Sequence, residues 1–187
     1  MTDQSCKEMG AAALGRGNNG TPLIEMRDIH KIFKTGAGDF IALNGVNVCL
    51  LEGEFVSVVG KSGSGKSTLV NMLTGIDHPT SGSVQVGEHY IHQLSEGQMS
   101  TWRGSNLGII FQFFQLLPML SILENIMLPM DFAKLIPFQE REERAMHLLE
   151  LVGLQDYAYD LPAEVSGGQQ QSAAIARALA NDPPIII

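Results

Sequence analysis

Cysteine is scarce in this sequence. Cys6 and Cys49 are the only two among 187 residues, and they are far apart. Neither belongs to a spacing that is typical of metal ligands. We therefore predict two reduced thiols and a cytosolic compartment, with a structural disulfide as the alternative.

Positive charge is also in short supply. Lys and Arg number 12 against 20 Asp and Glu, so the formal net charge is −8 and the isoelectric point is near 5.0. Proteins that bind nucleic acid through its phosphate backbone present a basic surface. The acidic balance argues against nucleic acid as a partner.

Long uninterrupted apolar runs are missing. The most hydrophobic stretch, residues 107–130, is broken too often for a membrane-spanning helix; the interruptions are Gln112, Gln115, Pro118, Ser121, Glu124 and Asn125. Asp3 and Glu8, with no apolar segment after them, argue against a signal peptide. If the protein works at a membrane, we expect it to do so through a partner that spans it.

The chain is long enough for one globular domain, since 44% of its residues are hydrophobic. Residues 1–20 are rich in Gly, Ala and Asn without periodicity, which predicts a flexible tail. Short alternating runs from Leu23 to Leu51 predict antiparallel strands with a turn at residues 36–39, and residues 83–86 predict another strand.

Helices are predicted mainly in the second half of the chain. Capping-box patterns begin at Ser95 and Ser121, and we expect Pro129 to limit the second of these helices. A third, from Phe138 to Val152, has an apolar stripe, an expected ion pair between Glu140 and Arg144, and Gly153 as its end. These helices predict an α/β core that carries a helical subdomain.

Residues 60–68 match the phosphate-binding pattern G-x-x-x-x-G-K-[ST] at every fixed position. Residues 54–59 before them predict a buried strand, and a helix follows up to Gly75. Glycines let successive N–H groups point at phosphate oxygens, and the helix N-terminus adds its positive dipole end. We expect Lys66 to reach the β- and γ-phosphates and Ser67 to ligate Mg²⁺. The alternative is a glycine-rich turn with a surface lysine. The candidate binding residues are Gly60, Lys61, Ser62, Gly63, Ser64, Gly65, Lys66, Ser67 and Thr68.

Two further residues are candidates by position. Residues 107–111 predict a buried strand that ends on Gln112, and sheets of this class bind ligands at the ends of their strands. Phe33 is an isolated aromatic residue, for which stacking on adenine and packing in the core are both open.

Ser166-Gly167-Gly168-Gln169-Gln170 is a second glycine turn that leads into an Ala-rich segment. Such a turn opens a helix with a serine hydroxyl and free backbone N–H groups, which suits an anion. The alternative is an ordinary capped helix start.

Together the two motifs resemble the nucleotide-binding subunit of ABC transporters, and within that superfamily the lipoprotein-release and macrolide-export group. The resemblance runs from about residue 23 to the last residue. It includes Pro79-Thr80-Ser81-Gly82, Phe111-Gln112, Leu116-Leu117-Pro118, Leu123-Glu124-Asn125-Ile126, Leu128-Pro129 and Ala174-Ile175-Ala176-Arg177-Ala178-Leu179.

The resemblance implies a fold, ligands and residue roles. The fold is a P-loop NTPase core, a mixed sheet with antiparallel N-terminal strands, with an inserted helical subdomain. The core would span 21–112, the subdomain about 113–165, and the signature helix with the next strand 166–187. ATP and Mg²⁺ are the implied ligands, with Phe33 on the adenine. Gln112 would sense the metal and the attacking water, and Lys66 would act beside it in catalysis. The signature residues that close over the γ-phosphate would be Ser166, Gly167, Gly168 and Gln169.

The resemblance also implies partners. The active unit would be a head-to-tail homodimer in which each ATP lies between the phosphate loop of one chain and the signature of the other. A transmembrane permease subunit would use the ATP cycle for export or lipoprotein release. The chain would therefore lie on the cytoplasmic face of the cell membrane, as a peripheral ATPase.

The sequence departs from the family in three places. Ser172 stands where the family usually has arginine, and Val165 stands where it has leucine. Residues 183–187 resemble the start of the strand that ends on a magnesium-binding aspartate, and the metal aspartate, catalytic glutamate and switch histidine of the family would all follow. We expect this C-terminally truncated chain to hydrolyse ATP negligibly. The alternative to a transport subunit is a non-catalytic nucleotide-binding fragment or remnant.

Overall fold

The structure, a computed structural model, describes residues 21–36 and 38–187. The predicted tail, residues 1–20, lies outside the described residues. The chain divides into two compact units, unit 1 ending at Met99 and unit 2 spanning Ser100–Ile187. The division at about residues 112 and 165 that the sequence suggested stays a prediction.

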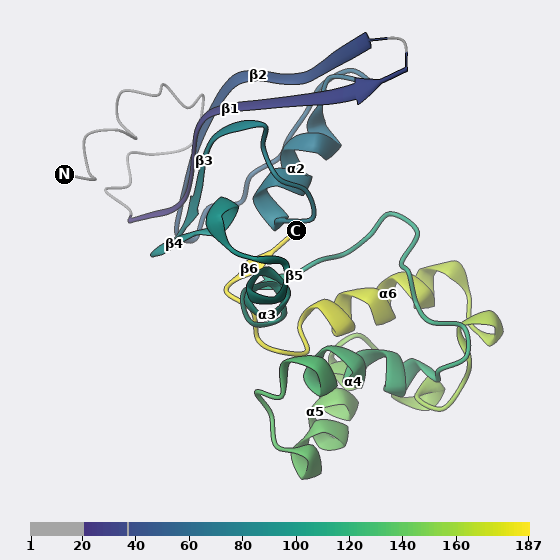
Figure 1. Ribbon diagram of the computed structural model, residues 1–187. Coiled ribbons are helices and arrows are strands. Elements are labelled where there is room, and N and C mark those ends of the chain that lie inside the picture. The colour runs from purple at the N-terminus through teal and green to yellow at the C-terminus, as the bar shows by residue number, and fades with distance from the viewer. Residues whose placement is uncertain (1–20, 37) are drawn as a thin grey trace. The chain divides into compact units, whose positions relative to one another are not determined.

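Unit 1 is built on a four-stranded antiparallel sheet. Strands β1 (Pro22–Thr35) and β2 (Gly38–Leu51) form a long hairpin (Figure 1). Strand β3 (Ser81–Val86) pairs with the other edge of β1, and β4 (His89–Tyr90) follows, so that the order is β2-β1-β3-β4. Period-two alternation directs one face of β1 and β3 inward, where the buried side chains are Ile24, Met26, Ile29, Val84 and Val86. The predicted antiparallel strands are confirmed.

Helix α2 (Lys66–Thr74) follows the phosphate loop as predicted. It ends at Gly75, whose φ of 64° is the left-handed conformation that closes helices. A short 3₁₀ turn (Ile91–Gln93) then leads to α3 (Glu96–Asn106). The predicted capping box at Ser95 is present, because its N–H donates to the Gln98 side chain at 3.0 Å.

The buried strand predicted before the phosphate loop is absent. Residues 54–59 form no strand, and Phe55 and Val59 are 99% and 85% exposed. An apolar segment is buried as a strand only when neighbouring strands pair with its two edges. None of the residues in 21–36 and 38–187 pairs with this segment. The apolar pattern was therefore an insufficient predictor here.

Unit 2 is mainly helical. It contains α4 (Ile122–Ala133), α5 (Phe138–Leu151) and α6 (Gly167–Ala178), with 3₁₀ turns at Gln155–Tyr157 and Pro162–Glu164. Their apolar stripes meet in one core, whose fully buried members include Ile122, Ile126, Met130, Ala145, Leu149, Ala173 and Ala176. Figure 1 shows the three helices packed side by side.

Two predictions for the helices of unit 2 need correction. Pro129 lies inside α4, which continues to Ala133. Arg144 does not pair with Glu140; its guanidinium turns inward and donates to the carbonyls of Leu179 and Ala180 at 3.4 and 2.7 Å. Carbonyls at a helix C-terminus lack intrahelical partners, so they compete for that cation with the exposed carboxylate.

The strand predicted over residues 107–111 is shorter than expected. Strand β5 is Leu107–Gly108, and it pairs in parallel with β6 (Ile185–Ile186). The ladder extends by one hydrogen bond, from Ile110 N to the carbonyl of Ile187 at 2.7 Å. Phe111 therefore lies past the paired part of the strand.

Cys49 is disulfide-bonded, so the prediction of two reduced thiols is wrong. Cys6 is the only other cysteine in the sequence, and it lies outside the described residues.

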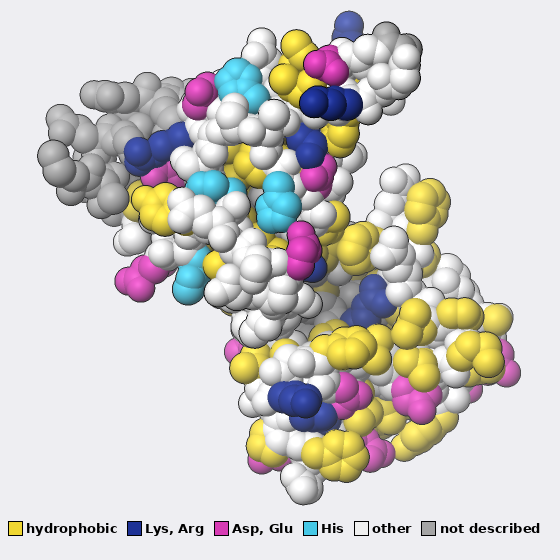
Figure 2. Space-filling model, viewed as in Figure 1, with side chains coloured by type: hydrophobic (Ala, Val, Ile, Leu, Met, Phe, Trp, Pro, Cys, Tyr) yellow, Lys and Arg dark blue, Asp and Glu magenta, His cyan; other side chains and the backbone are white. Residues whose placement is uncertain are grey.

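No helix in the described part of the chain is both long enough and apolar enough to cross a membrane. Apolar side chains are nevertheless exposed over the helices of unit 2 (Figure 2). They include Phe132, Leu135 and Phe138, which are 77%, 54% and 69% exposed near the connection between α4 and α5.

Candidate functional site

The phosphate loop has a backbone that only glycine supports at two positions. Gly63 and Gly65 have φ values of 77° and 87°, in the left-handed region. A Cβ at Gly65 would also lie 2.7 Å from the Ala42 carbonyl oxygen of β2. These two glycines curl the chain, and Gly65 lets it approach β2 closely.

The helix that follows the loop has no side-chain cap. The N-cap of α2 is Gly65, which offers no side chain to the first-turn N–H groups. Helices α4 and α6 differ, because Ser121 with Glu124 and Ser166 with Gln169 form complete capping boxes. The first amides of a helix need acceptors. Helix α2 therefore leaves its donors for a ligand, and its dipole favours an anion there.

The side chain of Lys66 folds back over the phosphate loop. Its Nζ donates to the carbonyls of Gly60 and Lys61 at 2.9 and 2.8 Å. The hydroxyl of Ser67 beside it is exposed, and among the residues that the structure describes it has no hydrogen-bond partner. A cation, an unbonded hydroxyl and free amides around one curled loop fit a polyphosphate with a divalent cation.

Phe33 is not a core residue. It lies on β1 with 38% of its surface exposed. The loop meets the neighbouring strand close to this point: a Cβ at Gly65 would lie 3.1 Å from Leu43 Cδ2, and Leu43 pairs with Lys31 on β1. Phe33 follows Lys31 by two residues and shares its face of the strand. The end of the phosphate loop thus packs against β2 at the residue that pairs with Lys31, two residues before the exposed ring.

Gln112 is exposed and begins a tight segment after β5. Phe114 and Gln115 both have positive φ, at 56° and 50°. Arg177 of α6 holds this segment, since its two terminal nitrogens donate to the carbonyls of Phe114 and Gln115, each at 2.6 Å. Burial lowers the pKa of Arg177, but a guanidinium stays charged at any ordinary pH. Our sequence reasoning gave Arg177 no role; its isolation in an Ala-rich helix was the only available signal.

Replacing Arg177 with methionine is expected to loosen residues 112–116. Two charge-assisted hydrogen bonds would be lost from left-handed residues, so the free energy of local opening should fall by about 1–3 kcal/mol. Hydrogen–deuterium exchange would measure this, with the amides of α5 as the internal reference. Arg177→Lys keeps the charge but not the fork, and should give an intermediate rate. Equal exchange in all three proteins would contradict this role.

The signature residues begin α6. The Ser166 hydroxyl accepts from the N–H of Gln169 at 3.3 Å, and the Ser166 N–H donates to the Gln169 side chain at 2.8 Å. Gly167 and Gly168 are exposed, and a Cβ at either would meet nothing within 4 Å. The helix start is thus capped, as the alternative of an ordinary capped helix start predicted. Its two glycines leave the backbone N–H groups accessible to a ligand.

The candidate residues fall into two groups. Phe33 and residues 60–68 belong to unit 1, whereas Gln112 and residues 166–169 belong to unit 2. Within unit 1, β2 links the phosphate loop to the strand that carries Phe33. Within unit 2, Arg177 links the signature helix to the segment after Gln112.

Comparisons with known proteins agree with these observations. The sequence profile of the ABC transporter family matches residues 43–187. An uncharacterized ABC transporter ATP-binding protein of Thermotoga maritima is 45% identical over 165 residues, 88% of this chain and 70% of that protein. The macrolide export ATP-binding/permease protein MacB of Hyphomonas neptunium is 40% identical over 166 residues, 89% of this chain and 26% of that protein.

A solved structure matches as well. The ATP-binding cassette MJ0796, a protein of Methanocaldococcus jannaschii, was determined as a dimer in a post-hydrolysis state bound to ADP and Pi. It is similar to this chain with a TM-score of 0.81 and 41% identity, over 87% of this chain and 72% of that one. The predicted fold class is thereby confirmed. With its phosphate loop, its signature helix and this likeness, the chain belongs to the ABC transporter family as an ATP-binding cassette.

Proposed function

We propose that this chain binds ATP with Mg²⁺ and couples the nucleotide to transport through a membrane permease subunit. The observation that carries the proposal is the uncapped N-terminus of α2, where left-handed glycines, Lys66 and unpaired amides surround one loop. A neutral ligand would leave these donors and this charge without a counterpart. The alternative, a non-functional remnant, gives no reason for an intact phosphate site.

Each residue of the loop has a proposed part. The amides of residues 65–68 donate to phosphate oxygens, and Lys66 exchanges its two carbonyl acceptors for the β- and γ-phosphates. Ser67 would hold Mg²⁺, which neutralises part of the phosphate charge when bound. Phe33 would stack on the adenine.

A second copy of the chain is the proposed partner. Gly167 and Gly168 at the start of α6 are exposed and have room around them, so an anion held by another subunit could approach their N–H groups. The dimeric relative MJ0796, with its ADP and Pi, supports this arrangement. The permease subunit and a position on the cytoplasmic face of the membrane follow the ATP-binding/permease relatives and stay proposals.

Gly168→Asp tests the shared site. The added side chain has open space, so the variant should fold as the unmodified chain does, yet its carboxylate would repel the γ-phosphate of a partner's ATP. ATP with Mg²⁺ should therefore drive dimer formation in the unmodified chain but not in the Gly168→Asp variant, measured by sedimentation velocity. Gly153→Asp is unsuitable as a control, because the φ of Gly153 is 70° and an aspartate there would strain the backbone. Gln155→Asp, on the surface of unit 2, adds the same carboxylate away from the signature and serves as the control. Equal dimerisation of all three proteins would contradict a signature-based interface.

A further inference from the structure

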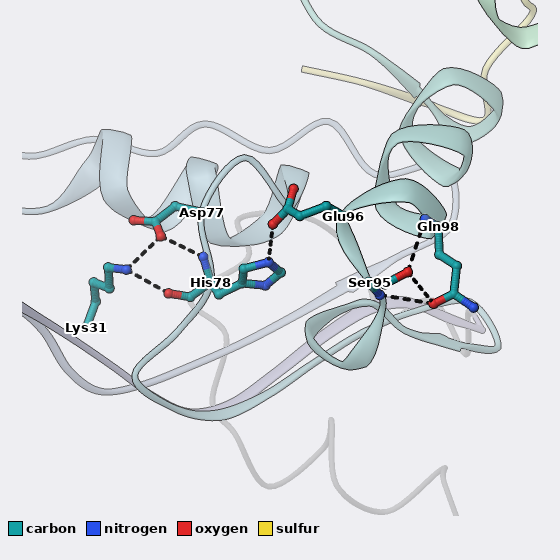
Figure 3. Close-up of polar contacts among 6 residues, drawn as sticks. All are labelled: Lys31, Asp77, His78, Ser95, Glu96 and Gln98. Atoms are coloured by element: carbon teal, nitrogen blue, oxygen red, sulfur yellow. Dashed lines mark hydrogen bonds and ion pairs between the residues drawn. The ribbon is translucent and has the colours of Figure 1, made fainter.

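Lys31 is a charged residue with little exposure and fixed partners. Its side chain is 13% exposed, and its Nζ lies 2.7 Å from Asp77 Oδ1 and 2.8 Å from the carbonyl oxygen of His78 (Figure 3). The same Asp77 oxygen accepts the N–H of His78 at 2.7 Å. Because a poorly solvated charge is stable only when it is paired, these acceptors hold the ammonium in one position.

That ammonium also contacts the aromatic ring of Phe33. The Lys31 Nζ lies 4.9 Å from the ring centroid, over its face. Such a contact is attractive, since the ring face is negative and the ammonium is here partly desolvated. It restricts the orientation of a ring that otherwise projects from a strand with 38% of the residue exposed. One face therefore has a partner in the protein, and the exposed part of the ring is available to a ligand.

The Lys31–Asp77 pair joins two elements of the candidate site. Lys31 belongs to β1, which carries Phe33, whereas Asp77 follows α2, the helix that begins at the phosphate loop. Asp77 is tied back to that helix, because its N–H donates to the Asn71 carbonyl at 3.2 Å. The ion pair thus fixes β1, which carries the Phe33 ring, relative to α2, which begins at the phosphate loop. His78 also contacts Glu96 of α3 at 3.2 Å. This contact is exposed to solvent, so it contributes little to stability.

We propose that Lys31 positions the Phe33 ring for stacking on the base of a bound nucleotide, and that Asp77 holds Lys31 there. The inference rests on the nucleotide-binding function proposed above and adds a determinant of base affinity. Lys31 is a positioning residue, since it acts through Phe33. A merely structural role for the pair would change the affinity for any polyphosphate, whereas positioning of the ring changes only the part that the base contributes.

The test compares two ligands that differ in the base. Equilibrium binding of ATP and of inorganic tripolyphosphate, each with Mg²⁺, is measured by calorimetry on the whole chain. Lys31→Met should weaken ATP by about fivefold and leave tripolyphosphate unchanged. Lys31→Arg keeps a cation near the ring and should bind both ligands as the unmodified chain does. Lys34→Met removes an equal charge from an exposed position of the same strand and serves as the matched control.

Two further variants make the result specific. Asp77→Asn removes the charged partner of Lys31, so it should lower the affinity for ATP and leave the affinity for tripolyphosphate unchanged. This variant replaces Lys31→Met in the test if Lys31→Met does not fold. In a Phe33→Ala background, Lys31→Met should cause no additional loss, because its effect passes through the ring. Equal losses for ATP and tripolyphosphate, or additive losses in the double variant, would overturn the inference.

Failure of the inference can be told from failure of the proposed function. An unmodified chain that binds neither ligand contradicts the proposed function itself. If Phe33→Ala weakens ATP binding but Lys31→Met does not, the inference is overturned and the proposed function is not affected.

Discussion

Replacing Lys66 with alanine is expected to lower the affinity for ATP by at least about 100-fold. The ammonium would make two charge-assisted contacts with phosphates, each contributing about 1.5–3 kcal/mol, and 1.4 kcal/mol corresponds to a factor of ten in affinity. In the ligand-free chain the same nitrogen donates to the carbonyls of Gly60 and Lys61. These are neutral acceptors, so a phosphate oxygen competes well for the cation.

Calorimetric titration with ATP and Mg²⁺ measures the loss. Lys34→Ala is the charge-matched control, because Lys34 is exposed on β1 in the same unit and should change the affinity less than threefold, roughly the effect of one exposed, screened charge. Far-UV circular dichroism shows whether the fold is kept. A Lys66→Ala chain that binds ATP within about fivefold of the unmodified affinity would show that the nucleotide binds elsewhere, since charge-assisted contacts with phosphate contribute more than that.

Replacing Asn125 with alanine is expected to destabilise unit 2 by about 3–5 kcal/mol. Asn125 is fully buried in α4. Its side-chain oxygen accepts the N–H of Leu117 at 2.7 Å. Its amide nitrogen lies 3.1, 3.0 and 2.9 Å from the carbonyl oxygens of Leu117, Leu120 and Ser121. Alanine would remove all of these contacts, leave backbone groups of the 117–120 turn without partners, and open a cavity.

Urea unfolding followed by circular dichroism measures this change, with hydrogen exchange of α4 to assign it to unit 2. Gln139→Ala is the control, since it also deletes an amide but from an exposed position of α5, and it should lie within about 0.5 kcal/mol of the unmodified chain. A loss of less than about 1 kcal/mol for Asn125→Ala would mean that water replaces the side chain in the turn.

Local chemistry was readable from the sequence where it depended on neighbouring residues. The capping boxes at Ser121 and Ser166, the helix stop at Gly153 and the hairpin of β1 and β2 each depend on neighbouring residue types, and all are present. At Ser121 the backbone N–H lies 2.7 Å from the Glu124 carboxylate, and this donation lowers the pKa of that carboxyl. Such contacts span three residues, so a single sequence contains both partners.

Contacts between distant residues could not be predicted. Residues 54–59 have a strand pattern, yet burial depends on edges that no local pattern contains. Arg144 could have paired with Glu140 one turn away, but it reaches Ala180 instead. Lys31 and Asp77 are 46 positions apart, and Arg177 and Gln115 are 62 apart. These long-range partners were the residues that our sequence reasoning missed at the site.

The hairpin that carries Phe33 has two mechanically different halves. Strand β3 accompanies β1 only from Ile24 to His30, whereas β2 continues to Thr35. Beyond His30 the described part of the sheet is a two-stranded ribbon, and its register shifts on both sides of Lys31. Two-stranded ribbons and bulges accommodate more twist than wide sheets. The tip of the hairpin can therefore bend while the wider half keeps its packing around Met26. The Lys31–Asp77 ion pair limits that bending where the strand carries Phe33.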